Sequence, residues 1–450
     1  MARRKTHAPL SVLINNRLAG RLSKQANGAI SFQYDESWLE WENSFAISLS
    51  LPMRETAYSG EPVVAVFDNL LPDSPNVRKR VAERMGAKGT DYYSLLEAIG
   101  RDCVGAMQFL PEEEIEARDA KTAPQVAGEN LSEHDIEAIL AGLGAAPLGV
   151  DKEQEFRISV AGAQEKTALL WHDGQWKRPI GITPTTHLLK PQLGEIPTAF
   201  GTIDMAASVD NEHYCLKLME EFGLDVAKTE IATFGARRVL VVERFDRLWR
   251  NNTNLLRLPQ EDCCQALGIP SEQKYQSNGG PRIVDIMKLL QGSDNPTKDQ
   301  LDFFKSQIIF WLIGATDGHG KNFSIFLKPE GRYSLTPFYD VLTAQPAFDK
   351  RQIPNNKYKL AMSLGKSRHY RILEVVGRHF VQTGKAAGLG PKPMRQAIEE
   401  ILDLAKTAPD KAHSAMPNDF AHEVHESIVK AISVRLRLLE PALDEIQSRT

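Results

Sequence analysis

The residues best suited to chemistry in this sequence lie in one short segment and at one later position. Residues 315–322 read Ala-Thr-Asp-Gly-His-Gly-Lys-Asn, and Asp340 follows further along the chain. Residues 301–314, directly before the segment, are apolar nearly all round and are therefore expected to form a buried helix. The spacing of Thr297 and Gln300 predicts a capping box at the start of this helix. A polar cluster at its far end would be held at the edge of a rigid core.

Two strand-like stretches predict where Asp340 lies. Residues 323–327 and 332–336 are joined by Lys-Pro-Glu-Gly, which favours a turn, so we expect a hairpin. If Leu327 pairs with Arg332, the returning chain brings Asp340 back toward the end of the buried helix. Cross-strand neighbours lie about 4.5–5.5 Å apart, so a slip of a residue or two would leave them close.

The residue types that would meet there suit phosphoryl transfer. In protein kinases, an aspartate that orients the attacking hydroxyl and an asparagine that binds Mg²⁺ form the pattern Asp-x-x-x-x-Asn, and a second metal-binding aspartate follows later. Asp317 and Asn322 have this spacing, and Asp340 is the later carboxylate. Mg²⁺ prefers oxygen ligands and keeps several waters, so a carboxylate, an amide and nucleotide phosphates form a suitable set. The alternative is an ordinary loop, because Asp-Gly and Gly-Lys-Asn are common turn sequences.

A second region offers an anion-binding loop and a lysine. Residues 157–166 include Ala-Gly-Ala, which would let backbone N–H groups approach an anion closely. This signal is weak by itself, because neither the Walker nor the full Gly-x-Gly-x-x-Gly spacing is present. Lys190 ends a strand that should be interior, where a lysine is costly unless it meets an anion such as the phosphates of ATP. A lysine that reaches solvent from an edge strand, next to Pro191, is equally compatible.

The segments after Lys190 fit the same scheme. Residues 209–222 predict a helix, and Glu212 in its first turn could pair with Lys190 as the corresponding glutamate does in kinases. The favoured interpretation is an acid that only answers the helix dipole. Residues 239–243 predict a buried strand, and the link that follows could hold an adenine ring through its backbone.

The remaining pattern gives a coarse outline of the fold. Ser132 with Asp135 predicts a capped helix, Asp173 and Gly174 predict a hairpin turn, and the chain after residue 246 reads as mostly helical apart from the hairpin at 323–336. Further strands are expected at 10–14, 29–34, 46–51 and 104–110, and further helices at 94–99, 394–404 and 423–439.

Composition limits the class of protein. A chain of 450 residues is expected to form two or three domains or lobes, and its formal charge of −4 argues against broad nucleic-acid binding. Four cysteines without a Cys-x-x-Cys pair suit a reducing cytoplasm better than disulfides or zinc. The longest apolar run, 308–315, is too short to cross a bilayer, and the basic start lacks the apolar core of a targeting peptide. We therefore expect a soluble cytoplasmic protein with no membrane partner.

Several long motifs resemble the HipA toxin kinase family, and the resemblance covers almost the whole chain. They are Asp-Asn-Leu-Leu-Pro-Asp-Ser at 68–74, Ile-Gly-Arg-Asp-Cys-Val-Gly-Ala at 99–106, Phe-Arg-Ile-Ser-Val-Ala-Gly-Ala-Gln-Glu-Lys-Thr-Ala-Leu at 156–169, Gly-Ile-Thr-Pro-Thr-Thr-His at 181–187, Val-Glu-Arg-Phe-Asp-Arg at 242–247 and Thr-Asp-Gly-His-Gly-Lys-Asn-Phe-Ser at 316–324.

The resemblance implies an α+β protein with a two-lobed, protein-kinase-like fold, in which an extra first subdomain precedes an α/β N-terminal lobe and an all-α C-terminal lobe. It also implies an ATP- and Mg²⁺-dependent serine/threonine protein kinase, the toxin of a type II toxin–antitoxin pair that causes growth arrest and persistence. The expected divisions are a disordered lead at 1–7, an N-terminal α/β subdomain at 8–110, a connector at 111–130, the ATP-binding part of the N-lobe at 131–245 and the C-lobe at 246–450.

The same resemblance implies partners and a substrate. Family members act with a HipB antitoxin, whose dimer bridges the toxin to operator DNA, and they phosphorylate glutamyl-tRNA synthetase on serine. Lys385 matches one residue of a basic pair that contacts operator DNA, but Gly388 occupies the second position. Operator binding is therefore expected mainly through the antitoxin.

Site residues carry over by position. Asp317 matches the catalytic base, Asn322 and Asp340 match the Mg²⁺ ligands, and Ser159 matches an autophosphorylated serine whose phosphate would compete with ATP and inactivate the enzyme. The positions matching nucleotide contacts are Ala161, Gly162, Ala163, Gln164, Glu165, Lys166, Lys190, Glu243, Arg244, Phe245, His319, Gly320, Lys321, Asn322, Tyr339 and Asp340.

Two other functions compete with this one. A metal-dependent phosphohydrolase could use Asp317, His319 and Asp340 as ligands, although such sites need enough ligands to hold a metal without nucleotide. A non-catalytic scaffold for antitoxin and DNA is the other alternative, and it leaves the base, metal ligands and lysine unexplained.

Overall fold

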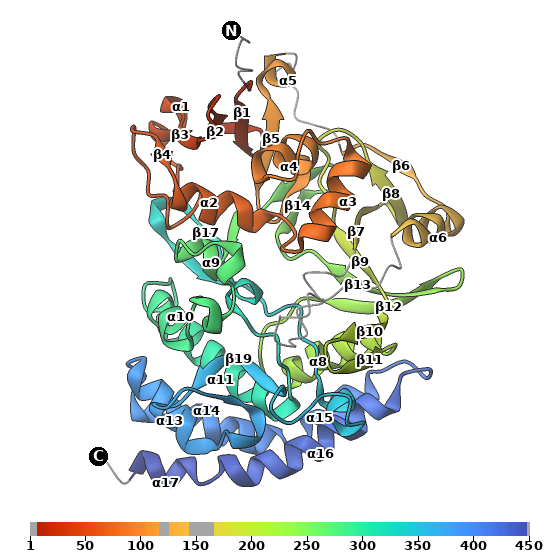
Figure 1. The fold of residues 1–450 in the computed structure, drawn as a ribbon, viewed down its shortest axis with the longest axis vertical. Coiled ribbons are helices and arrows are strands. Elements are labelled where there is room, and N and C mark those ends of the chain that lie inside the picture. Colours follow the sequence, from red (N-terminus) through yellow and green to blue (C-terminus); the bar gives the residue numbers. More distant parts are fainter. Residues whose placement is uncertain (1–6, 117–125, 144–165, 448–450) are drawn as a thin grey trace.

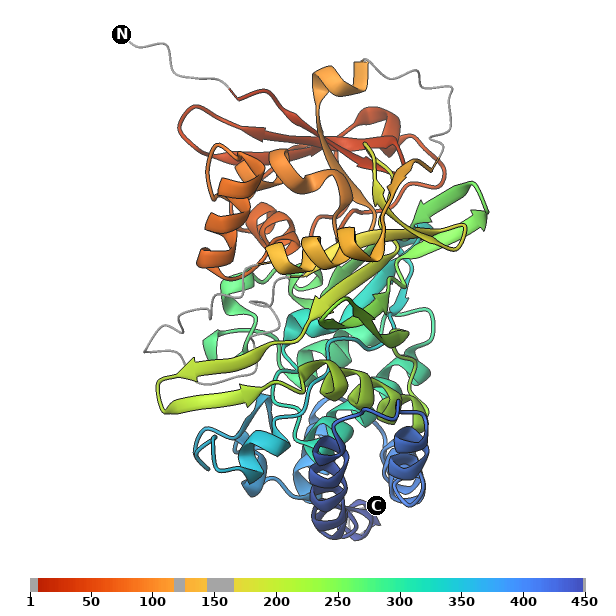
Figure 2. The same cartoon turned by 90° about the vertical axis from the view of Figure 1, so that its right-hand side faces the viewer.

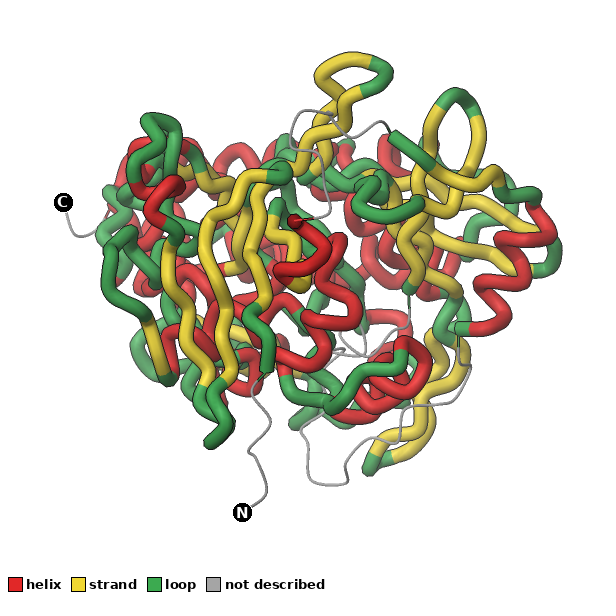
Figure 3. The backbone as a smooth tube through the Cα atoms, turned by 90° about the horizontal axis from the view of Figure 1, so that it is seen from above, coloured by secondary structure: helices red, strands yellow, loops and turns green. Residues whose placement is uncertain are grey.

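The computed structural model describes residues 7–116, 126–143 and 166–447. The chain forms tiers stacked along the long axis of the molecule, with the N-terminal domain at one end and the C-terminal helices at the other (Figures 1 and 2). Strands form separate small groups rather than one continuous sheet, which is clear when the molecule is viewed from above (Figure 3).

The N-terminal domain is a five-stranded antiparallel sheet in the order β4-β3-β2-β1-β5, packed against short helices. β2 was not predicted; it pairs with β1 through Asn15 and Asn16, whose positive φ angles of 47° and 68° make the tight turn. The bounds are β1 (Leu10–Ile14), β2 (Arg17–Lys24), β3 (Ile30–Tyr34), β4 (Tyr58–Ser59), β5 (Met107–Pro111), α1 (Glu36–Leu39), α2 (Glu61–Phe67), α3 (Pro75–Met85), α4 (Tyr92–Ile99) and α5 (Glu112–Glu116).

The strand predicted at 46–51 is wrong, because this segment is a loop held by a side chain instead of a neighbouring strand. The Tyr34 hydroxyl donates to the Leu51 carbonyl at 2.5 Å and accepts from the Ile47 N–H at 3.0 Å. These bonds satisfy the buried backbone groups without a ladder partner. Val104 likewise lies before β5 rather than in it.

The middle tier is a six-stranded antiparallel sheet in the order β12-β13-β9-β7-β8-β6. The predicted Ser132–Asp135 capping box and Asp173–Gly174 turn are both confirmed. The bounds are β6 (Gly128–Asn130), β7 (Thr167–His172), β8 (Gln175–Pro179), β9 (His187–Pro191), β10 (Gly194–Thr198), β11 (Gly201–Met205), β12 (Thr229–Phe234), β13 (Arg237–Glu243), α6 (Glu133–Gly142) and α8 (Ser208–Glu221).

The two faces of this sheet carry different helices because side chains alternate along each strand. Val239 and Val241 of β13 pack with Ile136 of α6. Leu240 and Val242, one residue out of phase, pack on the other face with α8. Any residue of β9 that faces the same way as Leu240 is therefore directed at α8.

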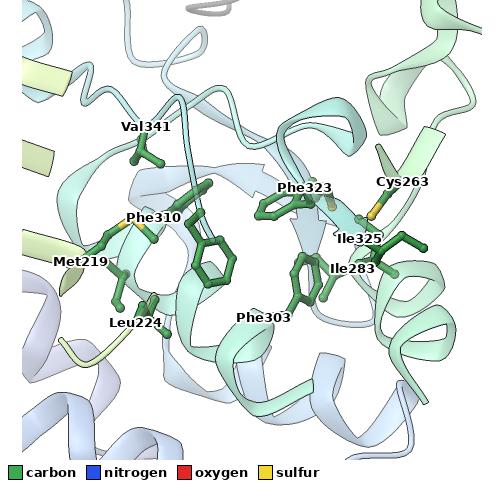
Figure 4. Close-up of a cluster of buried hydrophobic side chains, with 14 of the residues drawn as sticks. Met219, Leu224, Cys263, Ile283, Phe303, Phe310, Phe323, Ile325 and Val341 are labelled. Atoms are coloured by element: carbon green, nitrogen blue, oxygen red, sulfur yellow. The ribbon is translucent and has the colours of Figure 1, made fainter. Parts of the chain in front are cut away.

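The lower tier is built around α11, which is buried from Asp302 to Ile313 as predicted, although it also buries polar side chains such as Lys305 and Gln307. Figure 4 shows Phe303 and Phe310 of α11 between Met219 on one side and Ile283 on the other. The helix bounds are α9 (Cys263–Ala266), α10 (Ile283–Leu290), α11 (Pro296–Ile313), α12 (Gln345–Asp349), α13 (Gly377–Ala386), α14 (Pro391–Leu404), α15 (Ala408–Ser414), α16 (His422–Leu439) and α17 (Ala442–Gln447).

The predicted capping box of α11 does not form. The helix starts at Pro296, its N-cap residue Asn295 makes no side-chain cap, and Gln300 instead donates to the Met287 carbonyl at 2.9 Å. Proline at the first helical position has no N–H to satisfy, which reduces the need for a cap.

The C-terminal part, expected to be all-α, also carries short antiparallel sheets. They are β14 (Arg247–Asn251) with β15 (Asn254–Arg257), β16 (Gln260–Asp262) with β17 (Ser324–Leu327) and β18 (Tyr333–Leu335), and β19 (Lys359–Leu364) with β20 (His369–Arg371). All four cysteines are buried and free. None of the helices in the described parts of the chain combines the length and apolar character that a membrane crossing requires.

Candidate active site

Lys190 lies on β9, an interior strand between β13 and β7. Its partner across β13 is Leu240, so its side chain faces α8 and leaves only 5% of the residue exposed. The Lys190 Nζ lies 2.7 Å from Glu212 Oε1 on α8 and 2.9 Å from Asp340 Oδ1. The lysine therefore meets anions in the interior, and the interpretation of Glu212 as an acid that only answers the helix dipole is wrong.

The three charges shift one another's pKa. Burial alone would lower the pKa of Lys190, but Asp340 and Glu212 raise it, so the ammonium stays charged. Burial opposes ionisation of Asp340, yet Lys190 and then Lys166 hold its pKa at about 2. Burial raises the pKa of Glu212 despite the attraction of Lys190. Two carboxylates share one lysine, so with both acids ionised the cluster carries a net negative charge that favours the binding of a further cation.

The segment after α11 forms a tight loop that ends in Asn322. Gly314 ends the helix in a left-handed conformation with a φ of 75°. The Asp317 carbonyl then accepts from the His319 N–H at 2.7 Å and from the Asn322 Nδ2 at 2.8 Å. The amide nitrogen of Asn322 is thus engaged within the loop, which leaves its Oδ1 as the atom suited to a ligand. We refer to residues 317–322 as the catalytic loop.

The side chain of Asp317 is oriented by Tyr275, whose hydroxyl donates to Asp317 Oδ1 at 2.5 Å. Tyr275 also packs edge-on against His319, with ring centroids 4.9 Å apart. Burial lowers the pKa of His319 well below its usual value, so the ring is neutral near pH 7. Gly318 packs on Phe310, where an added Cβ would lie 2.5 Å from the ring.

The β17–β18 hairpin brings the Asp340 segment back to the catalytic loop. Leu327 pairs with Tyr333 rather than Arg332, so the predicted register is one residue off, within the slip that the argument tolerates. The Tyr339 hydroxyl donates to the Lys321 carbonyl at 2.8 Å, which places the residue before Asp340 directly beside the loop. Asp340 itself has a left-handed φ of 59°, which is uncommon for a residue with a Cβ.

Helix α8 is tied to the same segment at a second point. The Asn211 side chain donates to the Thr343 carbonyl and accepts from the Thr343 N–H, both at 2.9 Å. Adjacent residues of α8 are therefore both tied to the site: Asn211 binds Thr343 in the segment after Asp340, and Glu212 binds Lys190, which also binds Asp340.

The residues matched to nucleotide contacts are only partly described. Phe245 packs against Tyr339 with ring centroids 5.6 Å apart, which forms an aromatic wall beside Lys190's strand. The backbone N–H groups of Glu243 and Arg244 donate to neighbouring strands and loops rather than outward. Ser159 and five predicted contacts lie outside the described residues, namely Ala161, Gly162, Ala163, Gln164 and Glu165.

The Arg244 side chain takes part in a buried network of ion pairs. Its guanidinium is buried and bonds to Asp246 at 2.9 Å and to Asp102 at 3.3 Å. Arg247 and Arg257 also bind Asp102, at 2.9 Å and 3.0 Å. This network joins the Ile-Gly-Arg-Asp and Val-Glu-Arg-Phe-Asp-Arg motifs, and nothing in the sequence spacing indicated that they meet.

The basic residue matched to DNA contact, Lys385, is exposed near the end of α13. Gly388 follows with a φ of 80°, a conformation that favours glycine. The second position of the basic pair is thus used here for the turn that leaves α13.

A lysine on an interior strand, a glutamate on the helix behind it and an aspartate from a second lobe form the arrangement of protein kinases, and the fold is two-lobed and protein-kinase-like. Residues 10–110 match the family described as HipA N-terminal domain, and residues 158–409 match the HipA-like C-terminal domain. The chain therefore belongs to the HipA family.

Individual relatives agree with this assignment. The putative kinase Y4mE of Sinorhizobium fredii is 34% identical over 400 residues, which cover 89% of this chain and 90% of the relative. The serine/threonine-protein kinase toxin HipA of Shewanella oneidensis is 26% identical over 358 residues, covering 76% and 77%. The structure of the HipA, HipB and operator DNA complex from Shewanella oneidensis matches with a TM-score of 0.79 at 22% identity, covering 97% of this chain and 99% of that one.

Proposed function

We propose that this protein is an ATP- and Mg²⁺-dependent serine/threonine protein kinase, the toxin of a toxin–antitoxin pair. The observation that carries the proposal is the buried contact of Lys190 with both Glu212 and Asp340. Burying three charges is costly, and a kinase needs this arrangement to bind the phosphates of ATP.

The residues present fit Mg²⁺. Asp340 offers a carboxylate whose pKa is held at about 2, so it is ionised at neutral pH, and Asn322 offers an amide oxygen. These are the oxygen ligands that Mg²⁺ prefers, with nucleotide phosphates and water completing the set. The bound ion would neutralise charge on the phosphates during transfer.

Asp317 would act as the catalytic base. Its carboxylate, oriented by Tyr275, would accept the proton of a serine hydroxyl as the serine oxygen bonds to the γ-phosphorus and the bond to ADP breaks. Lys190, Lys166 and the neutral His319 would contact the nucleotide, and Phe245 and Tyr339 would form the wall beside the adenine.

The finer biology rests on the family assignment. We propose a HipB-like antitoxin dimer as partner, operator DNA bound mainly through that antitoxin, co-repression of the operon, and a cytoplasmic location. Glutamyl-tRNA synthetase is the proposed substrate, which links phosphorylation to growth arrest. Autophosphorylation at Ser159 would inactivate the kinase by placing a phosphate on the loop that binds ATP.

Transfer of labelled γ-phosphate from ATP to purified tRNA synthetases tests the proposal. Wild type should label glutamyl-tRNA synthetase on serine, and Asp317→Asn should not. Asp403→Asn is the matched control, because Asp403 is an exposed residue of α14 whose ion pair is with Lys406, in the turn just after that helix. Loss of toxicity in Asp317→Asn with antitoxin binding retained separates a kinase from a scaffold, whereas equal toxicity of both variants refutes the kinase.

A further inference from the structure

A turn of the N-terminal domain contacts the catalytic loop. Residues 68–74, which we call the acidic turn, lie between α2 and α3 and carry the Asp-Asn-Leu-Leu-Pro-Asp-Ser motif. The Lys321 Nζ lies 2.7 Å from the Asn69 carbonyl, 3.0 Å from Asn69 Oδ1 and 3.1 Å from Asp73 Oδ1. The other oxygen of Asp73 lies 2.7 Å from the Lys274 Nζ. One carboxylate from the first domain thus holds two lysines of the C-terminal lobe.

The acidic turn is also held by hydrogen bonds that do not involve these lysines. Arg78 forms a bidentate pair with Asp68 at 2.7 Å and 3.0 Å and donates to the Pro72 carbonyl at 2.6 Å. The Asn69 amide donates to the Ala65 carbonyl at 2.6 Å and to the Ile269 carbonyl at 2.9 Å. These bonds hold Asn69 and Asp73 in place. A residue that positions another side chain must itself be held in this way.

Both lysines lead to the catalytic loop. Lys321 belongs to the loop, next to Asn322. Lys274 accepts the Gly320 N–H at its backbone carbonyl, at 3.2 Å, and it precedes Tyr275, which orients Asp317. A displacement of Lys321 would therefore move its neighbour Asn322, and a displacement of Lys274 would move Asp317 through Tyr275.

The cluster is mostly buried, so its charges act strongly on one another. The side chains of Asp73, Lys274 and Lys321 expose 19%, 9% and 13% of their surface. Burial opposes ionisation of Asp73, but Lys321 and Lys274 hold its pKa well below its usual value. Asp262 lies 3.9 Å from Lys321 as a weaker second acid.

We propose that the N-terminal domain supplies Asn69 and Asp73 as positioning residues of the catalytic centre, which hold Lys321 and Lys274 and thereby fix the catalytic loop for phosphoryl transfer. This inference rests on the proposed kinase function. It makes the first domain part of the enzyme rather than an attached module.

A double-mutant cycle tests the coupling, with Asp73→Asn, Lys321→Met and the two combined. Asp73→Asn keeps the side-chain volume and removes the charge. If Asp73 acts through Lys321, Asp73→Asn should lower kcat about tenfold or more, and adding it to Lys321→Met should lower kcat by less than about threefold further. Asp73→Glu, which restores the charge, should recover part of the lost kcat.

Asp91→Asn is the matched control. Asp91 belongs to the same domain and pairs with Lys24 at 3.0 Å, but it caps α4 and contacts no residue of the catalytic loop. Its kcat should equal that of wild type. Melting temperatures of all variants are recorded, and kcat is measured at a temperature at which every variant is folded.

Three outcomes would overturn the inference: wild-type kcat in Asp73→Asn, independent losses that multiply in the double variant, or no advantage of Asp73→Glu over Asp73→Asn. Absence of phosphotransfer by wild type on any acceptor would instead count against the kinase proposal. Binding of a fluorescent ATP analogue, measured in parallel, shows whether the variants change nucleotide affinity as well as turnover.

Discussion

Replacing Lys190 by methionine would leave Glu212 and Asp340 facing each other in the interior without their shared cation. The lysine makes contacts of 2.7 Å and 2.9 Å with carboxylates whose side chains expose only 3% and 15% of their surface. Removing one partner of a buried ion pair costs about 3–5 kcal/mol, because the remaining charge is uncompensated. We expect a loss of stability in this range at pH 8.

The loss should depend on pH in a defined direction. In wild type, the lowered pKa of Asp340 contributes stability that is fully present above its unfolded pKa, about 3.9, and is lost only as pH falls toward about 2. The raised pKa of Lys190 contributes stability below its unfolded pKa, about 10.4. In wild type the raised pKa of Glu212 lowers stability somewhat as pH rises above its unfolded pKa, about 4.3, whereas the stability from Lys190 and Asp340 is flat from about pH 5 to pH 8. Without the lysine, burial and mutual repulsion raise the pKa of the acids, so the variant loses stability as pH rises through that window.

Urea unfolding, followed by tryptophan fluorescence at pH 5 and at pH 8, measures both the loss of stability and its dependence on pH. Lys305→Met is the matched control, because Lys305 is equally buried but its partner Glu400, at 3.1 Å, is 38% exposed. A half-solvated pair of this kind should cost about 1 kcal/mol or less. A loss below about 1 kcal/mol in Lys190→Met, or a loss that is the same at both pH values, would show that the buried charges are not coupled as described.

Three further changes test other parts of the site and fold. Tyr275→Phe removes a hydrogen bond to a carboxylate worth about 1.5–3 kcal/mol, so kcat should fall about tenfold or more with KM for ATP little changed, as measured by initial rates. Asp340→Asn should abolish the Mg²⁺ dependence of nucleotide binding while leaving the fold intact, checked by titration with and without the ion and by circular dichroism. Gly314→Ala places a Cβ 2.0 Å from the Tyr358 hydroxyl at a φ of 75°, so the melting temperature should fall by several degrees, corresponding to about 1–3 kcal/mol.

Local sequence patterns predicted the elements that carry the site but only part of its connections. The Asp-x-x-x-x-Asn spacing and the hairpin turn were enough to bring the Asp340 segment near the catalytic loop, because both depend on a short stretch of chain. The register was one residue off, since turn sequences constrain loop length only loosely. The missing capping box of α11 reflects the same limit, because Gln300 finds a tertiary partner instead.

Contacts between distant segments could not be predicted. The direction of Lys190 depends on which face of the sheet α8 covers, and sequence alone left an edge strand equally acceptable. Asp73 and Lys321 lie far apart in the chain, and acidic residues in a turn are ordinarily solvated. The buried arginines around Asp102 gave no signal either, because each motif alone is compatible with an exposed charged link.

The attachment of α8 has a consequence for control. Eukaryotic kinases commonly switch by swinging the helix that carries this glutamate. Here Asn211 binds Thr343 and Glu212 binds Lys190, the lysine that also binds Asp340, so a regulator that pulled α8 outward would have to break a buried ion pair and two side-chain-to-backbone hydrogen bonds together. Inhibition by a group that blocks access to the site therefore requires less free energy than inhibition by displacement of α8.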